Sequence, residues 1–309
     1  EFVSLPATAT VGDAIEAIRE LDEDFESVYY VYTEDPSGML TGVLSLRTLI
    51  VADRDATLGQ LAYRDLVYVS PDEDQEDVTD EMTKYDLVAI PVCDENRHIL
   101  GIVTFDDAMD VMQDAATEDM EIMAAMTPSE KTYLKSTPFD LFKHRIPWLM
   151  LLMVSATFTG MIITSFEDAL SLLPVLTAFI PMLMDTGGNA GGQASVTIIR
   201  GLSLNEIEFK DAFKVVWKEA RVAVLCGLTL AAANFVKLLL FDRVTIAVAA
   251  VVCLTLVAAV FIAKIIGCLL PMLAKKIGFD PAVMASPFIT TIVDALSLLI
   301  YFSIATTIM

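Results

Sequence analysis

The most restrictive feature of this sequence is a series of long apolar stretches in its C-terminal half. A helix that crosses the hydrocarbon core of a bilayer needs about 20 residues. Helices are favoured there because every backbone polar group must find its partner inside the protein. We therefore expect an all-α polytopic membrane domain with five transmembrane helices. The five stretches are 146–166, 169–199, 222–241, 244–273 and 282–309.

Charge is divided unevenly between the two halves of the chain. Residues 1–130 carry 31 acidic and 6 basic side chains, whereas residues 131–309 carry 11 and 14. The mean hydropathy of +0.60 is high for a wholly soluble protein. The chain therefore divides near residue 130 into an acidic soluble part and a membrane part. Nucleic acid is excluded as a partner because phosphate contacts need Lys and Arg, whereas divalent cations suit an acidic surface.

The soluble part contains an internal repeat of about 60 residues, a strong sign of repeated architecture. Each copy has strand, helix and hairpin signals in the same order, and Gly42 and Ser45 in the first copy match Gly101 and Thr104 in the second. This order resembles a tandem pair of CBS domains, small α/β modules that often bind adenine nucleotides. The first CBS repeat is expected at 1–61, truncated at its start, and the second at 62–117.

The resemblance also implies a nucleotide site in the second repeat. CBS domains often place a hydroxyl and an aspartate on the ribose, and Thr104 and Asp107 complete that pattern. The first repeat has Thr48 in place of the aspartate, so one site is expected, with ATP as the candidate cofactor. The simpler alternative is that Asp106 and Asp107 only begin a helix, where carboxylates suit the positive end of the dipole.

The last apolar stretch holds one charged residue, Asp294, near its middle. A carboxylate at this depth costs about 2.5–3.5 kcal/mol and normally faces a partner or a water-filled path. We expect Asp294 to bind a cation in a pore, with Thr290 beside it and with Ser286 and Ser297 lining the path, because helical spacing places them in one stripe with Tyr301. The alternative is an ion pair between Asp294 and a lysine of a neighbouring helix.

The second stretch combines glycines with polar side chains. Two overlapping GxxxG patterns are formed by Gly187, Gly188, Gly191 and Gly192. A polar stripe at helical spacing consists of Asp185, Asn189, Gln193, Thr197 and Arg200. We expect the four glycines and Gln193 to line the pore, and Asn189 and Asp185 to be candidate metal ligands. The alternative is close helix packing, with Asn and Gln forming hydrogen bonds between helices.

Basic residues flank the five stretches mainly on one side. That side carries Lys143, Arg145, Arg200, Lys210, Lys214, Lys218, Arg221, Lys275 and Lys276. The other side offers Glu167, Asp168, Asp242 and a single basic residue, Arg243. Because cytoplasmic loops carry the excess of Lys and Arg, we expect the soluble part in the cytoplasm and the C-terminus outside.

Three motifs in the membrane part resemble the MgtE-type magnesium channels. They are the Gly-Asn-Ala-Gly-x-Gln-Ala-Ser run at 188–195 with Arg-Gly at 200–201, the Lys-x-Arg-x-Pro-Trp-Leu run at 143–149, and the Pro-Phe-Ile-Thr-Thr-x-x-Asp run at 287–294. The resemblance implies a homodimer in the plasma (inner) membrane that passes Mg²⁺ along its two-fold axis through a pore domain at 146–309. It makes Asp294 the ion site and 118–145 a connecting plug helix. A helical acidic domain usually precedes the CBS pair in this family, and we expect this domain to be lacking here.

Together these features predict a Mg²⁺-selective channel for magnesium uptake, gated by cytoplasmic Mg²⁺ and ATP acting on the CBS domains. Binding of Mg²⁺ between facing carboxylates would draw the two subunits together and move the plug helix over the pore. The candidate ligands for these regulatory ions are Asp106, Asp107, Asp110, Glu118, Asp119 and Glu121. The alternative for these carboxylates is an ordinary solvated acidic face.

The main rival function is a secondary transporter that exchanges a divalent cation for Na⁺ or H⁺. Lys237 and Lys264 lie within apolar stretches and are candidate coupling groups, although long basic side chains also reach the membrane surface without such a role. An enzyme is not expected, because the apolar stretches contain no combination of a nucleophile and a base.

Overall fold

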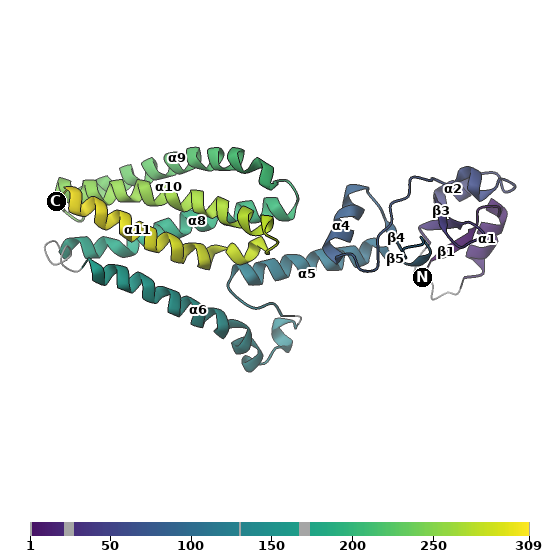
Figure 1. Cartoon of the computed structure of the whole chain (residues 1–309), viewed down its shortest axis with the longest axis horizontal. Coiled ribbons are helices and arrows are strands. Elements are labelled where there is room, and N and C mark those ends of the chain that lie inside the picture. The colour runs from purple at the N-terminus through teal and green to yellow at the C-terminus, as the bar shows by residue number, and fades with distance from the viewer. Residues whose placement is uncertain (1, 22–27, 130, 167–173, 309) are drawn as a thin grey trace. The chain divides into compact units, whose positions relative to one another are not determined.

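The computed structural model describes residues 2–21, 28–129, 131–166 and 174–308. The chain divides into two compact units, 1–116 and 117–309. The first unit is α/β and the second is helical (Figure 1).

The first unit repeats one small α/β motif. In the first copy, β1 (Val3–Pro6) pairs in parallel with β2 (Tyr30–Glu34), which pairs antiparallel with β3 (Leu40–Ser45). In the second copy, β4 (Ala89–Cys93) pairs antiparallel with β5 (Ile99–Thr104), and the strand equivalent to β1 is reduced to a parallel bridge between Val69 and Val92. The helices are α1 (Val11–Arg19), α2 (Leu46–Val51), α3 (Leu58–Leu61), α4 (Gln75–Lys84) and the start of α5 (Phe105–Met123).

Each copy has its own apolar core, and a third cluster joins the two copies. In that cluster Tyr32 and Leu40 of the first copy pack with Cys93 of the second. The matched glycines have different roles. A Cβ at Gly42 would lie 2.6 Å from Ala62 Cβ, whereas a Cβ at Gly101 would meet nothing within 4 Å. Only Gly42 is required by close packing.

The connecting segment at 118–145 is not one helix, contrary to our expectation. Helix α5 ends at Met123 and is followed by Ala125 with a positive φ of 55°. Helix α6 (Pro138–Ser165) begins with Pro138 at its first position, behind a capping box formed by Thr137 and Asp140. Among the described residues between them, only the short 3₁₀ turn η1 (Tyr133–Lys135) is helical.

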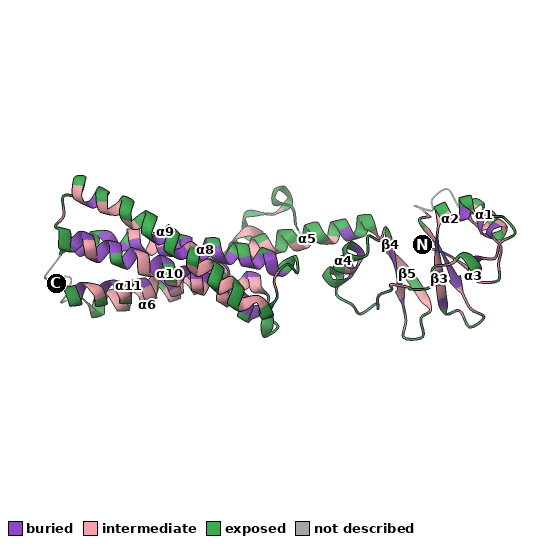
Figure 2. Cartoon of the chain, turned by 90° about the horizontal axis from the view of Figure 1, so that it is seen from above, coloured by how far each residue is buried: buried purple, intermediate pink, exposed green. Residues whose placement is uncertain are grey.

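The second unit is built from five long helices in the described part of the chain: α6, α8 (Ile180–Ser203), α9 (Ala212–Leu240), α10 (Ile246–Lys276) and α11 (Ser286–Ile308). Short 3₁₀ turns precede α8 (Pro174–Phe179), α9 (Phe209–Asp211) and α11 (Pro281–Met284). Helix α10 is central and packs against α8, α9 and α11, while α11 also packs against α8 and α6. Figure 2 shows the resulting concentration of buried residues along α10 and α8.

Four segments of these helices have the length and hydropathy of membrane spans: Pro138–Ser165, Phe209–Leu240, Ile246–Lys276 and Pro281–Ile308. Helix α8 corresponds to the second predicted stretch, of which residues 169–173 lie outside the described residues. Its polar side chains and glycines lower its hydropathy, and it is nevertheless packed between α10 and α11. We therefore assign α8 to the helical unit because it packs against α10 and α11, and not because of its hydropathy.

Candidate functional site

Glycines of α8 bring this helix directly against α11. A Cβ at Gly187 would lie 3.0 Å from Val293 Cγ1 and 3.2 Å from Ser297 Oγ, and a Cβ at Gly188 would lie 2.9 Å from Thr290 Cγ2. Any larger side chain would push the helices apart, as in small-residue helix interfaces generally. These contacts fix the register of α8 on α11.

Two further glycines bring α8 against α10. A Cβ at Gly267 would press directly on the carbonyl oxygen of Gly191 and would lie 3.1 Å from Ala194 Cβ. Gly192 is also buried. The structure thus places the four predicted pore glycines in buried positions. Gly187, Gly188 and Gly191 lie where α8 contacts α10 or α11 within one protomer. Their role in lining a pore stays a prediction.

The polar stripe of α8 lies on a different face from Gly187 and Gly191. Asp185, Asn189 and Gln193 are exposed, whereas Gly187 and Gly191 are buried. Within one protomer these three polar side chains therefore remain uncovered on a helix of the membrane domain. The alternative interpretation makes Asn189 and Gln193 hydrogen-bonding groups between helices. Neither side chain has a hydrogen-bond partner among the described residues of this chain.

Asp294 lies half-exposed on α11, and none of the described residues forms a hydrogen bond or an ion pair with its carboxylate. The two lysines that could have neutralised it have other partners. Lys264 Nζ lies 3.5 Å from Glu219 Oε2 in a buried pair, and Lys237 Nζ lies 2.9 Å from Asp242 Oδ2. The alternative of an ion pair at Asp294 is therefore not found among the residues that the structure describes.

The neighbours of Asp294 on α11 differ in exposure. Thr290 is partly exposed and donates a hydrogen bond of 2.9 Å to the carbonyl oxygen of Pro287. Ser297 is buried against Gly187. The side chain of Ser286 lies outside the described residues. Of the predicted stripe, Thr290 and Asp294 are therefore the partly accessible members.

Helices α8 and α11, which carry Asp185 and Asp294, pack against each other, so two carboxylates of one protomer lie on neighbouring helices. The described residues contain no cluster of three or more His, Cys, Asp or Glu side chains that could enclose a metal ion. Mg²⁺ usually keeps several of its waters and binds through one or two carboxylates. This donor set suits a hydrated Mg²⁺ that passes through as cargo.

The end of α5 contacts the end of the membrane helices within the second unit. Ile122 and Met123 pack on Ile199, Ala282 and Ala285. This apolar contact holds the last turn of α5 beside α8 and the 3₁₀ turn before α11.

Asp119 lies in the same contact. Ser203 Oγ donates a hydrogen bond of 3.4 Å to its carboxylate. Burial, and next the negative charge of Asp280, raise the pKa of Asp119 above its ordinary value. A carboxylate that is desolvated beside another carboxylate is stabilised by any cation that binds between them.

The other acidic candidates of α5 are differently placed. Asp106, Asp110 and Glu118 are exposed. Asp107 Oδ2 accepts hydrogen bonds from Thr104 Oγ1 at 2.6 Å and from the Thr104 backbone N–H at 3.1 Å, and these bonds lower the pKa of Asp107. Thr104 and Asp107 thus cap the start of α5.

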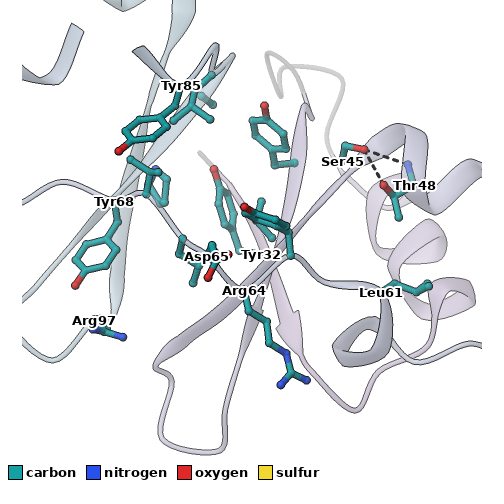
Figure 3. A pocket seen from close by; sticks show the side chains of 17 residues that line it. Tyr32, Ser45, Thr48, Leu61, Arg64, Asp65, Tyr68, Tyr85 and Arg97 are labelled. Carbon is teal, nitrogen blue, oxygen red and sulfur yellow. Dashed lines mark hydrogen bonds between the residues drawn. The ribbon is translucent and has the colours of Figure 1, made fainter. Parts of the chain in front are cut away.

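A cavity of about 840 Å³ lies in the first unit, between the two repeats (Figure 3). Ser45 and Thr48 of the first copy line it, and their hydroxyl oxygens lie 2.9 Å apart. Thr104 and Asp107 are not among its lining residues. The aromatic and basic side chains around it are Tyr30, Tyr32, Tyr63, Tyr68, Tyr85, Arg64 and Arg97.

Sequence reasoning missed this cavity. The available signal was composition, because six of the eight tyrosines lie between residues 29 and 85. The hydroxyl of Tyr32 is buried and has no hydrogen-bond partner among the described residues, and burial raises its pKa. An unpartnered buried hydroxyl in a cavity wall suits a polar ligand.

Comparisons with known proteins match both units. A family model described as a divalent cation transporter matches residues 180–304, and the CBS domain model matches residues 1–55 and 58–114. The magnesium transporter MgtE of Thermus thermophilus is 37% identical over 305 residues, which is 99% of this chain and 67% of that protein. The MgtE of Enterococcus faecalis is 35% identical over 308 residues, covering 99% of this chain and 66% of that protein.

Two solved structures match part of this chain. The soluble part of a magnesium transporter is 42% identical and covers 38% of this chain and 45% of that one, with a TM-score of 0.37. The cytosolic domain of the Mg²⁺ channel MgtE in complex with ATP is also 42% identical and covers 36% of this chain and 44% of that one, with a TM-score of 0.35.

The sequence matches confirm the expected pair of CBS domains followed by a helical membrane domain. They also identify a transporter rather than an enzyme. The chain spans about two thirds of the length of its curated relatives and belongs to the MgtE family of magnesium transporters.

Proposed function

We propose that this chain forms the pore and part of the ion sensor of a homodimeric, Mg²⁺-selective channel for magnesium uptake. The observation that carries this proposal is Asp294, a carboxylate in a membrane helix with no cation partner among the described residues of its own protomer. A group of this kind is expensive in a bilayer unless it serves an ion pathway.

The uncovered polar face of α8 supports a second copy as the partner. Asp185, Asn189 and Gln193 are exposed on the protomer, and amide and carboxylate groups are strongly disfavoured against lipid. A symmetric dimer that places this face on its axis would enclose these groups around water. The same arrangement would bring two copies of Asp294 to one path.

Two Asp294 side chains would attract Mg²⁺ without removing its water shell. Mg²⁺ loses water reluctantly, and conduction requires a site that attracts the ion but also releases it. Waters between the ion and the carboxylates would keep binding weak enough for release. Asn189 and Thr290 would then contact the hydrated ion as hydrogen-bonding groups.

Gating would use the contact at the end of α5. Cytoplasmic Mg²⁺ bound beside Asp119 and Asp280 would remove their mutual repulsion and hold α5 against α8 and the turn before α11. Release of the ion would restore the repulsion and favour separation, which is a two-state shift driven by differential ion binding. This mechanism requires the first unit to lie in the cytoplasm and the C-terminus outside, as the basic residues predict.

The test is Mg²⁺ flux into liposomes through the purified protein. Asp294→Ala and Asp294→Asn should both reduce flux strongly, with retained folding shown by gel filtration in detergent. Asp119→Asn should leave maximal flux intact but weaken inhibition by Mg²⁺ on the cytoplasmic side. Unchanged flux in both Asp294 variants would remove the ion pathway from the proposal.

We also propose that the cavity of the first unit binds an adenine nucleotide. Tyrosine rings can stack on a base, the Ser45 and Thr48 hydroxyls can bond a ribose, and the arginines can bind phosphates. The ligands expected at Thr104 and Asp107 do not line this cavity, so their role in binding stays a prediction. Ser45→Val should weaken ATP binding measured by calorimetry, whereas Thr104→Val should not; the reverse result would assign the nucleotide to the second repeat.

An exchanger is the second candidate, because the second unit contains a buried titratable pair, Lys264 and Glu219. Such a pair in a membrane domain is a possible proton-coupling site. Mg²⁺ flux measured with and without a pH gradient or a Na⁺ gradient distinguishes the two functions. A channel follows the Mg²⁺ gradient and the membrane potential alone.

A further inference from the structure

Helix α9 packs mainly on α10, and one of its faces points away from the helical unit. Its buried residues Ala223, Gly227 and Leu238 share the side that packs on α10. The opposite side carries exposed residues along its length (Figure 2). The chemistry of this outward face changes abruptly along the helix.

The first three turns of the outward face are aromatic and basic. Phe213 is 82% exposed and Trp217 is 59% exposed, and between and after them lie Lys214, Lys218 and Arg221, all exposed. We call these five residues the basic–aromatic band. From Val224 onward the same face is aliphatic, with Leu225 and Leu228 exposed.

This change locates the boundary between headgroups and hydrocarbon on α9. Trp side chains are enriched at the membrane–water interface because their rings are amphipathic. Aliphatic side chains that are exposed on a protomer belong to the hydrocarbon side of that boundary. The band therefore lies at headgroup level when the aliphatic face lies in the membrane.

The band carries two cations without a carboxylate partner among the described residues. Lys214 is neutralised by Asp211, at 2.8 Å. Lys218 has no ion pair in the described part of the chain, and Arg221 donates only to the backbone carbonyl of Trp217, with its guanidinium 5.8 Å from the Trp217 ring. Glu219, the acid between them, is turned inward to Lys264.

We propose that the basic–aromatic band binds the headgroup of an anionic phospholipid, with Lys218 and Arg221 on the phosphate groups and Trp217 at the interface. Charge complementarity selects this occupant, because two unpaired cations face a leaflet whose surface carries negative lipids. A zwitterionic headgroup offers its phosphate together with an ammonium group and would bind less well. The opposite side of the same turns, at Val215 and Val216, belongs to an apolar cluster with Ile198 and Leu202 of α8 and Cys268 and Met272 of α10, so the bound lipid would support the helix that carries the polar face.

Trp217 provides a direct probe, because the chain has only two tryptophans. In a Trp148→Phe background, quenching of Trp217 fluorescence is measured in nanodiscs that contain either a brominated phosphatidylglycerol or a brominated phosphatidylcholine at equal mole fraction. We expect stronger quenching by the anionic lipid, corresponding to a preference of roughly five-fold for each cation. High salt should reduce this preference.

Lys218→Gln combined with Arg221→Gln should abolish the preference while quenching by both lipids persists. Lys237→Gln is the matched control, since it also removes a lysine of α9 but at the opposite end of the helix. Equal quenching by the two lipids in the parent protein would overturn the proposal, as would a preference that survives the double substitution. Absence of quenching by either lipid would place the band away from the membrane and would also overturn it.

Discussion

Replacing Gly267 by alanine should destabilise the packing of α10 on α8. The new Cβ would press on the Gly191 carbonyl oxygen and lie 3.1 Å from both the Gly191 carbonyl carbon and Ala194 Cβ. Carbon atoms reach optimal contact at about 3.5–4.0 Å, so the helices would have to separate by roughly half an ångström or more. The obstacle is mainly backbone, which no rotamer change relieves. Overpacking costs about 1–3 kcal/mol, and we expect the upper end of this range.

Gly160→Ala is the matched control. Both substitutions occur inside long helices and gain the same helix propensity of about 0.8–1 kcal/mol, but a Cβ at Gly160 would meet nothing within 4 Å. The difference between the two variants therefore isolates the contact with α8. For a domain of this size, each kcal/mol shifts the melting temperature by about 2–4 °C, so Gly267→Ala should melt roughly 6–12 °C below Gly160→Ala.

The assay is thermal unfolding of both variants in one detergent at one scan rate, since membrane proteins often unfold irreversibly and the apparent midpoint then depends on the rate. Equal midpoints for the two variants would refute the close approach of α10 to α8. A Gly267→Ala midpoint above that of the parent protein would refute it more strongly, because the propensity gain would then act alone.

Two other predictions concern single ionic groups. In the first unit, His98 Nδ1 lies 2.9 Å from Asp94 Oδ2 and Nε2 lies 3.2 Å from the Ser37 carbonyl oxygen, so only a protonated ring donates both bonds. Asp94 raises the pKa of His98, and the stabilisation is complete below the unfolded-state value of about 6.5 and is lost as the pH rises through the raised value. Amide protection of residues 94–104, corrected for intrinsic exchange rates, should therefore fall as the pH rises above about 6.5. His98→Gln should remove this fall, and a parent protein with constant protection would contradict the argument. In the second unit, Lys264→Met should cost about 3–5 kcal/mol by leaving Glu219 as an unpaired buried charge, and adding Glu219→Leu should restore most of the loss in thermal unfolding. An equal loss in the single and double variants would show that the ion pair itself is stabilising.

The sequence alone located Asp294 because a carboxylate within an apolar stretch has few physical explanations. What it could not decide was whether a lysine neutralises this group. The answer depends on Lys264 and Glu219, which lie 45 residues apart in the chain and meet only when α9 packs on α10. No local pattern encodes that contact.

The glycines of α8 show what helical spacing predicts about the faces of a helix. Helical spacing alone separates Gly187 and Gly191 from Asp185, Asn189 and Gln193, because the two sets fall on different faces of one helix. The structure places the first set in helix contacts and leaves the second uncovered. The packing of the first set does not decide whether either set also lines a pore, and both roles stay predictions.

The connecting segment and the cavity were beyond the sequence for physical reasons. The family resemblance implied a plug helix at 118–145, but the positive φ at Ala125 and the capping box at Thr137 decide where helices end and begin. Pro128 and Pro138 mark interruptions of this segment in the sequence. The cavity is assembled from residues 30–97 of both repeats, so it exists only after the two copies have packed together.

The exposure of helix α6 determines which substitutions this helix tolerates. None of its residues is buried in the protomer, and its apolar window is 0% buried. Substitutions on its outward positions are therefore governed by partition between water and acyl chains rather than by fit to neighbouring side chains. A library of substitutions at Leu149, Met153 and Phe158 should accept almost any apolar residue of any shape, whereas charged residues should fail in proportion to their depth.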